Sequence, residues 1–223
     1  MALGRRLPLG AAALLVLALA ACGGGSKQSS PPTTTDANGC RTVTPPQGKA
    51  KTEPKPTARL DTAKTYDVRF DTNCGSFTIR LAVKTSPATT ASFVSLVRKG
   101  YFDGTVFHRI VPGFVIQGGD PTGTGTSGPG YTTIDPPPAS TRYTLGVAAM
   151  AKAGNEPAGA AGSQFFVVTA QDAQLPPDYA VLGKIVQGLP VVDAIGQLGD
   201  PSSGGTGTPT ETVEIAKATV DVH

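Results

Sequence analysis

The stretch of sequence that decides the fold runs from Tyr101 to Asp120 and reads YFDGTVFHRIVPGFVIQGGD. It holds two short apolar runs, 105–111 and 114–118, and the pair Pro112-Gly113 separates them. Apolar runs of this length between glycine and proline are typical of short strands. The stretch therefore predicts two strands joined by a tight turn.

Outward from this stretch, the chain shows the same short-strand pattern. Apolar and polar residues alternate over 66–70 and 77–81, on either side of the turn Asn73-Cys74-Gly75. Two alternating runs around a glycine-containing turn predict a β-hairpin. Further short apolar runs predict strands at 144–150, 164–169, 179–187 and 213–220.

Two helices interrupt the strands. Ser86-Pro87 has the order favoured at a helix N-cap and first turn, and Gly100 is a natural stop. A second short helix fits 189–198, where Val192, Ala194 and Ile195 are apolar. Many short strands with two isolated helices predict a mainly β fold, a closed antiparallel barrel with helical caps.

The N-terminus has the composition of a targeting segment. Arg5 and Arg6 precede an apolar stretch over 7–21, which is too short to span a membrane. Cys22 follows at once, so the segment resembles the lipobox of bacterial lipoproteins. We expect residues 1–21 to be a signal peptide, Cys22 to carry lipid, and the protein to sit on the outer face of the cytoplasmic membrane. The alternative is an ordinary cleaved signal with an incidental cysteine.

Residues 22–63 are rich in proline, threonine and glycine and poor in apolar side chains. Such a composition cannot bury enough surface to offset the entropy of ordering, so we expect a semi-extended linker that tethers a folded domain over 64–223.

The formal net charge is only +3, with no basic cluster, so we expect no nucleic-acid partner. The run 123–128 spells a dinucleotide fingerprint, but Pro129-Gly130 follows it and leaves no helix to receive a phosphate. We expect a flexible loop there.

The stretch 101–120 resembles the signature of the cyclophilins, and the resemblance returns at Met150-Ala151 and in GSQFFVVT over 162–169. It covers roughly 64–223. It implies an eight-stranded barrel and peptidyl-prolyl cis-trans isomerase activity that assists the folding of secreted or surface proteins. It implies no cofactor and no metal. We expect the partners to be proline-containing polypeptides, and the protein to be a monomer.

The resemblance also assigns site residues. Arg109 matches the catalytic arginine of the family, and Gln117 would orient it or the substrate carbonyl. Val115 and Gln117 lie two apart, as do Gln164 and Phe166, so each pair faces one way if these runs are strands. The substrate-binding residues implied by the match are Phe114, Val115, Ala151, Gln164, Phe166, Leu175 and Tyr179.

The assigned chemistry needs no nucleophile. Rotation about an Xaa-Pro bond is opposed by a barrier of about 18–20 kcal/mol, because amide resonance is lost on the way. A guanidinium beside the prolyl nitrogen can donate a hydrogen bond to the lone pair that becomes localised as the amide twists. That contact exists mainly in the transition state, as catalysis requires.

Three positions depart from the common family pattern. Many cyclophilins have asparagine at the place of Lys152, tryptophan at that of Gln174 and histidine at that of Tyr179. Because the tryptophan helps to bind cyclosporin, we expect weak binding of that drug. Two other readings remain open: a peptide-binding module with little activity, and a surface hydrolase, for which no nucleophile–base pair is evident.

If lipid occupies Cys22, the two other cysteines, Cys40 and Cys74, form an even pair. An oxidising compartment would permit a disulfide between them. Such a bond would hold the chain from Cys40 onward against the folded domain. The alternative is two unrelated thiols.

Overall fold

The computed structural model describes Thr35 and residues 39–203 and 205–223. The expected signal peptide and Cys22 lie outside the described residues. The chain divides by its internal contacts at Pro32, and the part from Thr33 onward holds every element described below. Its elements are β1 (Tyr66–Thr72), β2 (Gly75–Leu81), α1 (Pro87–Arg98), β3 (Thr105–Val106), β4 (Arg109–Val111), β5 (Val115–Gly118), β6 (Thr133–Ile134), β7 (Val147–Met150), β8 (Ala160–Ala161), β9 (Phe165–Val168), β10 (Val181–Gln187), α2 (Leu189–Gly196), a 3₁₀ turn (Pro201–Ser203) and β11 (Glu214–Val222).

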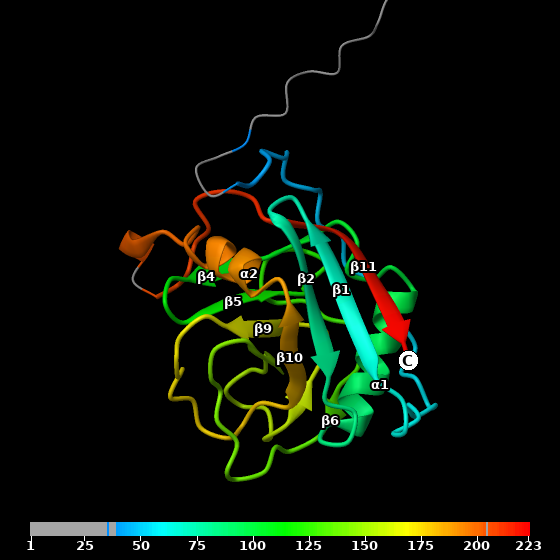
Figure 1. The fold of residues 1–223 in the computed structure, drawn as a ribbon. Coiled ribbons are helices and arrows are strands. Elements are labelled where there is room, and N and C mark those ends of the chain that lie inside the picture. Colours follow the sequence, from blue (N-terminus) through cyan, green and yellow to red (C-terminus); the bar gives the residue numbers. More distant parts are fainter. Residues whose placement is uncertain (1–34, 36–38, 204) are drawn as a thin grey trace, which may run out of the picture. The chain divides into compact units, whose positions relative to one another are not determined.

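Nine of the strands form one antiparallel sheet in the order β3-β11-β1-β2-β10-β7-β9-β5-β4 (Figure 1). The mainly β class is confirmed, but the closed eight-stranded barrel is wrong, because the sheet is open and curled, a half-barrel. Its edges, β3 and β4, are successive pieces of the predicted strand 105–111. The backbone of β3 pairs with β11 and that of β4 pairs with β5, so neither edge closes the sheet against the other. A small second sheet, β6-β8, was not predicted.

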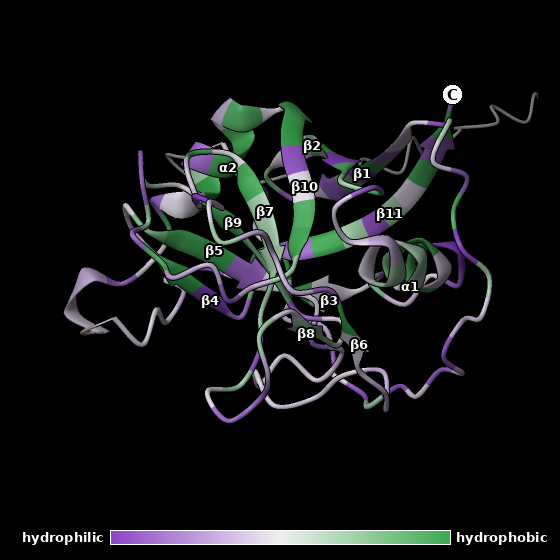
Figure 2. Ribbon diagram, turned by 90° about the horizontal axis from the view of Figure 1, so that it is seen from below, coloured by the Kyte–Doolittle hydropathy of each residue, from purple (hydrophilic) through white to green (hydrophobic). Residues whose placement is uncertain are grey.

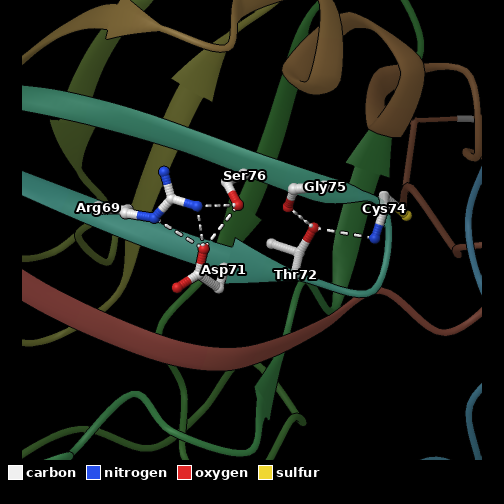
Figure 3. A network of polar contacts seen from close by, with 6 residues as sticks. All are labelled: Arg69, Asp71, Thr72, Cys74, Gly75 and Ser76. Atoms are coloured by element: carbon white, nitrogen blue, oxygen red, sulfur yellow. Dashed lines mark hydrogen bonds and ion pairs between the residues drawn. The ribbon is translucent and has the colours of Figure 1, made fainter.

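The predicted hairpin is present as β1 and β2, and Figure 3 shows its turn. Phe70 lies opposite Phe77 across the hairpin, and both rings are buried in the main core with centroids 5.1 Å apart. In the turn, the Thr72 hydroxyl donates to the Gly75 carbonyl at 2.7 Å and accepts from the Cys74 amide at 3.0 Å (Figure 3). These bonds fix the position from which Cys74 presents its sulfur.

The two faces of β5, β7 and β9 pack into two different hydrophobic clusters. Ile116, Ala148 and Val167 are buried in the main core. Their neighbours along the strands point the other way, as the twofold period of a strand requires. Those neighbours form a second apolar cluster on the opposite face, with Val115, Ala149, Phe166 and Val168 at its centre. Figure 2 shows β5 as hydrophobic along most of its length, because both faces are covered.

The two helices cover different parts of the sheet: α1 contacts β11 and β6, whereas α2 contacts β2, β4 and β5 (Figure 1). The helix at Pro87 is confirmed, but its expected cap is wrong. The Ser86 side chain makes no capping bond, and its buried hydroxyl has no partner among the described residues. The Asp135 carboxylate accepts from the Thr89 amide at 2.6 Å instead. A negative charge brought from a distant loop thus stabilises the positive end of the helix.

The segment before the hairpin lies against the domain. Residues 42–61 form no helix or strand, yet a disulfide joins Cys40 to Cys74, 34 positions away. Asn73, beside this bond, accepts from the Arg41 amide at 2.9 Å and donates its side-chain amide to the Arg41 carbonyl at 2.8 Å. From Cys40 onward, the chain is therefore held against the domain, as expected if Cys40 and Cys74 form a disulfide.

Candidate active site

Two neighbouring strands place the polar pair of the site. Arg109 on β4 lies opposite Gln117 on β5, and its guanidinium donates to the side-chain oxygen of Gln117, Oε1, at 3.5 Å. Arg109 also lies over the Phe114 ring, 5.9 Å from its centroid. Burial lowers the pKa of Arg109 from its ordinary value, although a guanidinium stays charged in proteins. No carboxylate among the described residues forms an ion pair with it, so its charge is available to a ligand.

A chain of side-chain amides continues from this pair. The Gln117 amide nitrogen donates to the Gln164 oxygen at 3.1 Å. The Gln164 nitrogen donates in turn to the carbonyls of Gly125 and Ser127, each at 3.0 Å. Because these two carbonyls can only accept, they fix which end of the Gln164 amide faces Gln117. Both glutamines are thus held in one orientation from the loop that follows β5.

Apolar side chains form the rest of the cleft. Val115 and Phe166 are almost fully buried and form its floor, and the rings of Phe166 and Tyr179 meet edge to face with centroids 5.4 Å apart. The cleft has a volume of about 200 Å³. Its lining contains eight of the nine residues that the sequence assigned, namely Arg109, Phe114, Val115, Gln117, Ala151, Phe166, Leu175 and Tyr179, together with Lys152. The ninth, Gln164, contacts the cleft through Gln117.

Tyr143 supports the cleft from below and was missed by the sequence analysis. Its side chain is fully buried, and its hydroxyl donates to the Tyr179 carbonyl at 2.6 Å and accepts from the Tyr179 amide at 2.9 Å. Burial raises the pKa of Tyr143 to about 12, so the hydroxyl keeps its proton at neutral pH. No motif marks Tyr143, because its partners are backbone groups 36 positions away.

The loop after α2 supports Arg109 from its other side, and this too was missed. The guanidinium donates to the Gly205 carbonyl at 3.1 Å, and the Gly207 carbonyl accepts from the Ile110 amide at 2.7 Å. A Cβ atom at Gly207 would lie 2.8 Å from the Arg109 side chain, so only glycine permits this approach. The glycines near 205 look like ordinary loop residues in the sequence.

The departures at Lys152 and Gln174 have different consequences. The Lys152 side chain is only 5% exposed and forms an ion pair with Asp178 at 3.1 Å. It also lines a neighbouring hollow of about 870 Å³, which shares Gln117 and Ala151 with the cleft. Gln174 is absent from the cleft lining and has a positive φ of 52°, whereas the next residue, Leu175, lines the cleft.

The arrangement can position a guanidinium and oriented amides beside an apolar pocket. No group of three or more His, Cys, Asp or Glu residues in the described part of the chain could hold a metal ion. The chemistry that these residues offer is electrostatic: a fixed donor beside a site that excludes water from an apolar group.

Comparison with known proteins identifies similar chains. The family model for cyclophilin-type peptidyl-prolyl cis-trans isomerases matches residues 67–220. Peptidyl-prolyl cis-trans isomerase-like 1 of Gibberella zeae is 36% identical over 163 residues, which cover 70% of this chain and 95% of that protein. The mouse protein of the same name is 37% identical over 162 residues, covering 71% and 94%.

A solved structure is similar as well. The crystal structure of a cyclophilin-type peptidyl-prolyl cis-trans isomerase of Cryptosporidium parvum has a TM-score of 0.63 at 29% identity, covering 70% of this chain and 98% of that one. The same isomerase in the presence of the dipeptide Ala-Pro gives a TM-score of 0.62 at 30% identity.

These relatives correct the expected location. The prediction of a lipid-anchored protein on the outer face of the cytoplasmic membrane is wrong, because the similar curated proteins come from fungi, plants and mammals. The comparisons support the family and not the lipoprotein form. Among the residues that the structure describes, no helix has the length and apolarity to cross a membrane.

Proposed function

The chain belongs to the cyclophilin-type peptidyl-prolyl cis-trans isomerases. We propose that it accelerates rotation about Xaa-Pro bonds in the cleft around Arg109. The observation that carries the proposal is a guanidinium at the edge of an apolar pocket that forms no ion pair with a carboxylate in the described part of the chain. A prolyl ring needs the pocket, and the prolyl nitrogen needs a donor only while the amide is twisted.

The apolar residues would hold the ring. Phe114, Val115, Phe166 and Leu175 line a volume suited to one proline side chain. With the ring fixed, the preceding carbonyl is the part of the bond that turns. Fixing one side of the rotating bond lowers the entropy that must be lost at the transition state.

Arg109 would stabilise the transition state electrostatically, by donating a hydrogen bond to the prolyl nitrogen. As the amide leaves planarity, its nitrogen becomes pyramidal and its lone pair becomes an acceptor. A hydrogen bond from a charged donor is worth about 1.5–3 kcal/mol, and each 1.36 kcal/mol gives about a tenfold change in rate. Gln117 would keep the guanidinium in place, since its oxygen accepts from Arg109.

The substrates that fit this site are polypeptides with an accessible Xaa-Pro bond. The cleft is open and continues into the hollow beside Lys152, so an extended chain can lie across it. The reaction breaks no covalent bond, and holding the ring and donating a hydrogen bond to the prolyl nitrogen require no cofactor.

Exchange spectroscopy on a short Xaa-Pro peptide tests the assignment. We expect wild-type protein to accelerate exchange between the cis and trans isomers, and Arg109→Ala to lower kcat/KM about a hundredfold while the protein stays folded. Arg98→Ala, which removes an exposed arginine at the end of α1, is the matched control and should retain full activity. Full activity of Arg109→Ala would overturn the site. A folded wild type that binds the peptide without catalysis would favour the binding-module alternative.

A further inference from the structure

The N-terminal strap, residues 39–55, follows one loop of the domain closely. That loop, residues 119–132, connects β5 to β6, and we call it the Asp120 loop. The strap amide of Lys49 donates to the Pro121 carbonyl at 3.0 Å, and the amide of Glu53 donates to the Pro129 carbonyl at 2.9 Å. The Lys55 ammonium donates to the Thr132 carbonyl at 2.8 Å.

Gly48 shows how tight this contact is. A Cβ atom at Gly48 would lie 2.2 Å from the Thr122 carbonyl oxygen and 2.6 Å from its carbon. Neither atom can move without moving the loop backbone. Glycine at position 48 is therefore required for the strap to approach the Asp120 loop.

The strap is itself anchored to rigid parts of the domain. The Cys40–Cys74 disulfide holds its start at the β1–β2 turn, where Figure 3 shows Cys74. The Lys51 ammonium donates to the Tyr101 carbonyl at 2.8 Å, and Glu53 forms an ion pair with Lys99 at 2.6 Å. Contacts on both sides make the strap a bridge between the domain framework and the Asp120 loop.

The Asp120 loop connects directly to the active site. Its carbonyls at Gly125 and Ser127 accept both hydrogens of the Gln164 amide, and Gln164 orients Gln117 beside Arg109. A shift of this loop would release Gln164 and, through it, Gln117. The family match begins at residue 67, so the strap lies outside the region matched by the family model.

We propose that the strap is a positioning element of the isomerase site, which holds the Asp120 loop so that Gln164 and Gln117 keep Arg109 in its working orientation. The proposal rests on the site assigned under Proposed function. The strap touches no reacting atom and acts only through the loop. Its loss should therefore lower kcat more than it changes KM, because apolar binding of the proline ring does not depend on the strap.

The test uses the full chain with two variants that loosen the strap by different routes. Gly48→Ala separates the strap from Thr122, and Cys40→Ser with Cys74→Ser frees its start. Hydrogen exchange at the Glu53 amide reports release of the strap, and the side-chain amide signals of Gln164 report its orientation. Gln47→Ala, which shortens an exposed neighbouring side chain, is the matched control.

We expect both loosened proteins to show faster exchange at Glu53, shifted Gln164 signals and a kcat about tenfold lower, with the control unchanged. Faster exchange at Glu53 with wild-type kcat and unshifted Gln164 signals would overturn the proposal, as would an equal fall in kcat in the control. Arg109→Ala, measured alongside, separates the two claims. If Arg109→Ala keeps wild-type activity, the assigned site is wrong. If Arg109→Ala loses activity while the strap variants keep wild-type activity, only the strap proposal is wrong.

Discussion

At the scale of single residues, the site depends on buried groups that never meet a substrate. Tyr143 is the clearest of these, because its hydroxyl satisfies both the amide and the carbonyl of Tyr179. Its ring also lies 6.2 Å from that of Phe166. One buried side chain thus supports two parts of the cleft, the Tyr179 segment through hydrogen bonds and the Phe166 ring in the floor through packing.

Tyr143→Phe should therefore weaken both stability and substrate binding. The ring remains, but two backbone groups of Tyr179 lose their partner, which costs about 1–3 kcal/mol when such groups are buried. We expect a lower midpoint in chemical denaturation and a raised KM, with kcat nearly unchanged because Arg109 is untouched. Tyr66→Phe, which removes a hydroxyl that accepts from the Asp61 amide and does not line the cleft, is a control for the loss of a tyrosine hydroxyl. A Tyr143→Phe protein with wild-type KM would contradict this role.

At the scale of elements, the strands and helices were largely predictable and the loops were not. The alternating run of 66–70 indicated β1 because its period matches a half-buried strand. The stretch 105–111 was predicted as one strand and is two, since Phe107 and His108 lie between the pairings with β11 and β5. The cap of α1 comes from Asp135, a long-range partner that no local pattern indicates.

The Asp120 loop shows the same limit. The glycine-rich run 123–128 was expected to be flexible, but the Asp120 carboxylate organises it. The side chain of Asp120 is fully buried and accepts from the amides of Thr122, Thr126 and Ser127 at 2.7, 2.9 and 3.1 Å. Burial alone raises the pKa of Asp120, but the hydrogen bond from the Thr122 hydroxyl, together with those from backbone amides of the loop, outweighs it and holds the pKa below its ordinary value.

The lowered pKa of Asp120 predicts in which direction the stability of the protein changes with pH. A carboxylate whose pKa is lower in the folded protein contributes stability above its unfolded pKa of about 3.9, and the contribution is lost as the pH falls through the folded pKa. We expect Asp120→Asn to destabilise the protein at pH 7 and to flatten the loss of stability between about pH 4 and 2. Denaturant midpoints measured across that range check it. Asp193→Asn, on α2 and away from the loop, is the control, and equal acid profiles for the two variants would contradict the role of Asp120.

At the scale of the whole molecule, the residues around the cleft could be found from the sequence because two ordered motifs carry them. Arg109 and Gln117 are eight positions apart, and the second motif supplies Gln164 and Phe166. What could not be found is the support that comes from distant segments: Tyr143, the loop at Gly205 and the contact of the strap with the Asp120 loop. Each of these contacts is made to or by backbone groups, whose partners depend on the three-dimensional path of the chain rather than on residue type.

The disulfide determines how the strap joins the rest of the molecule. It links residues separated by 34 positions, and in the chain-entropy model closing a loop of about 35 residues contributes roughly 3–4 kcal/mol by restricting the unfolded chain. The part of the chain that this bond retains has no helix or strand of its own, so its order depends on the bond and on contacts with the Asp120 loop. We expect Cys40→Ser with Cys74→Ser to lower the free energy of unfolding by about that amount, and reductant to have the same effect on wild type. The midpoint of the double variant should not respond to reductant, which is the internal control. If reduction leaves the wild-type midpoint unchanged, the strap is held by its hydrogen bonds alone and the disulfide contributes no stability.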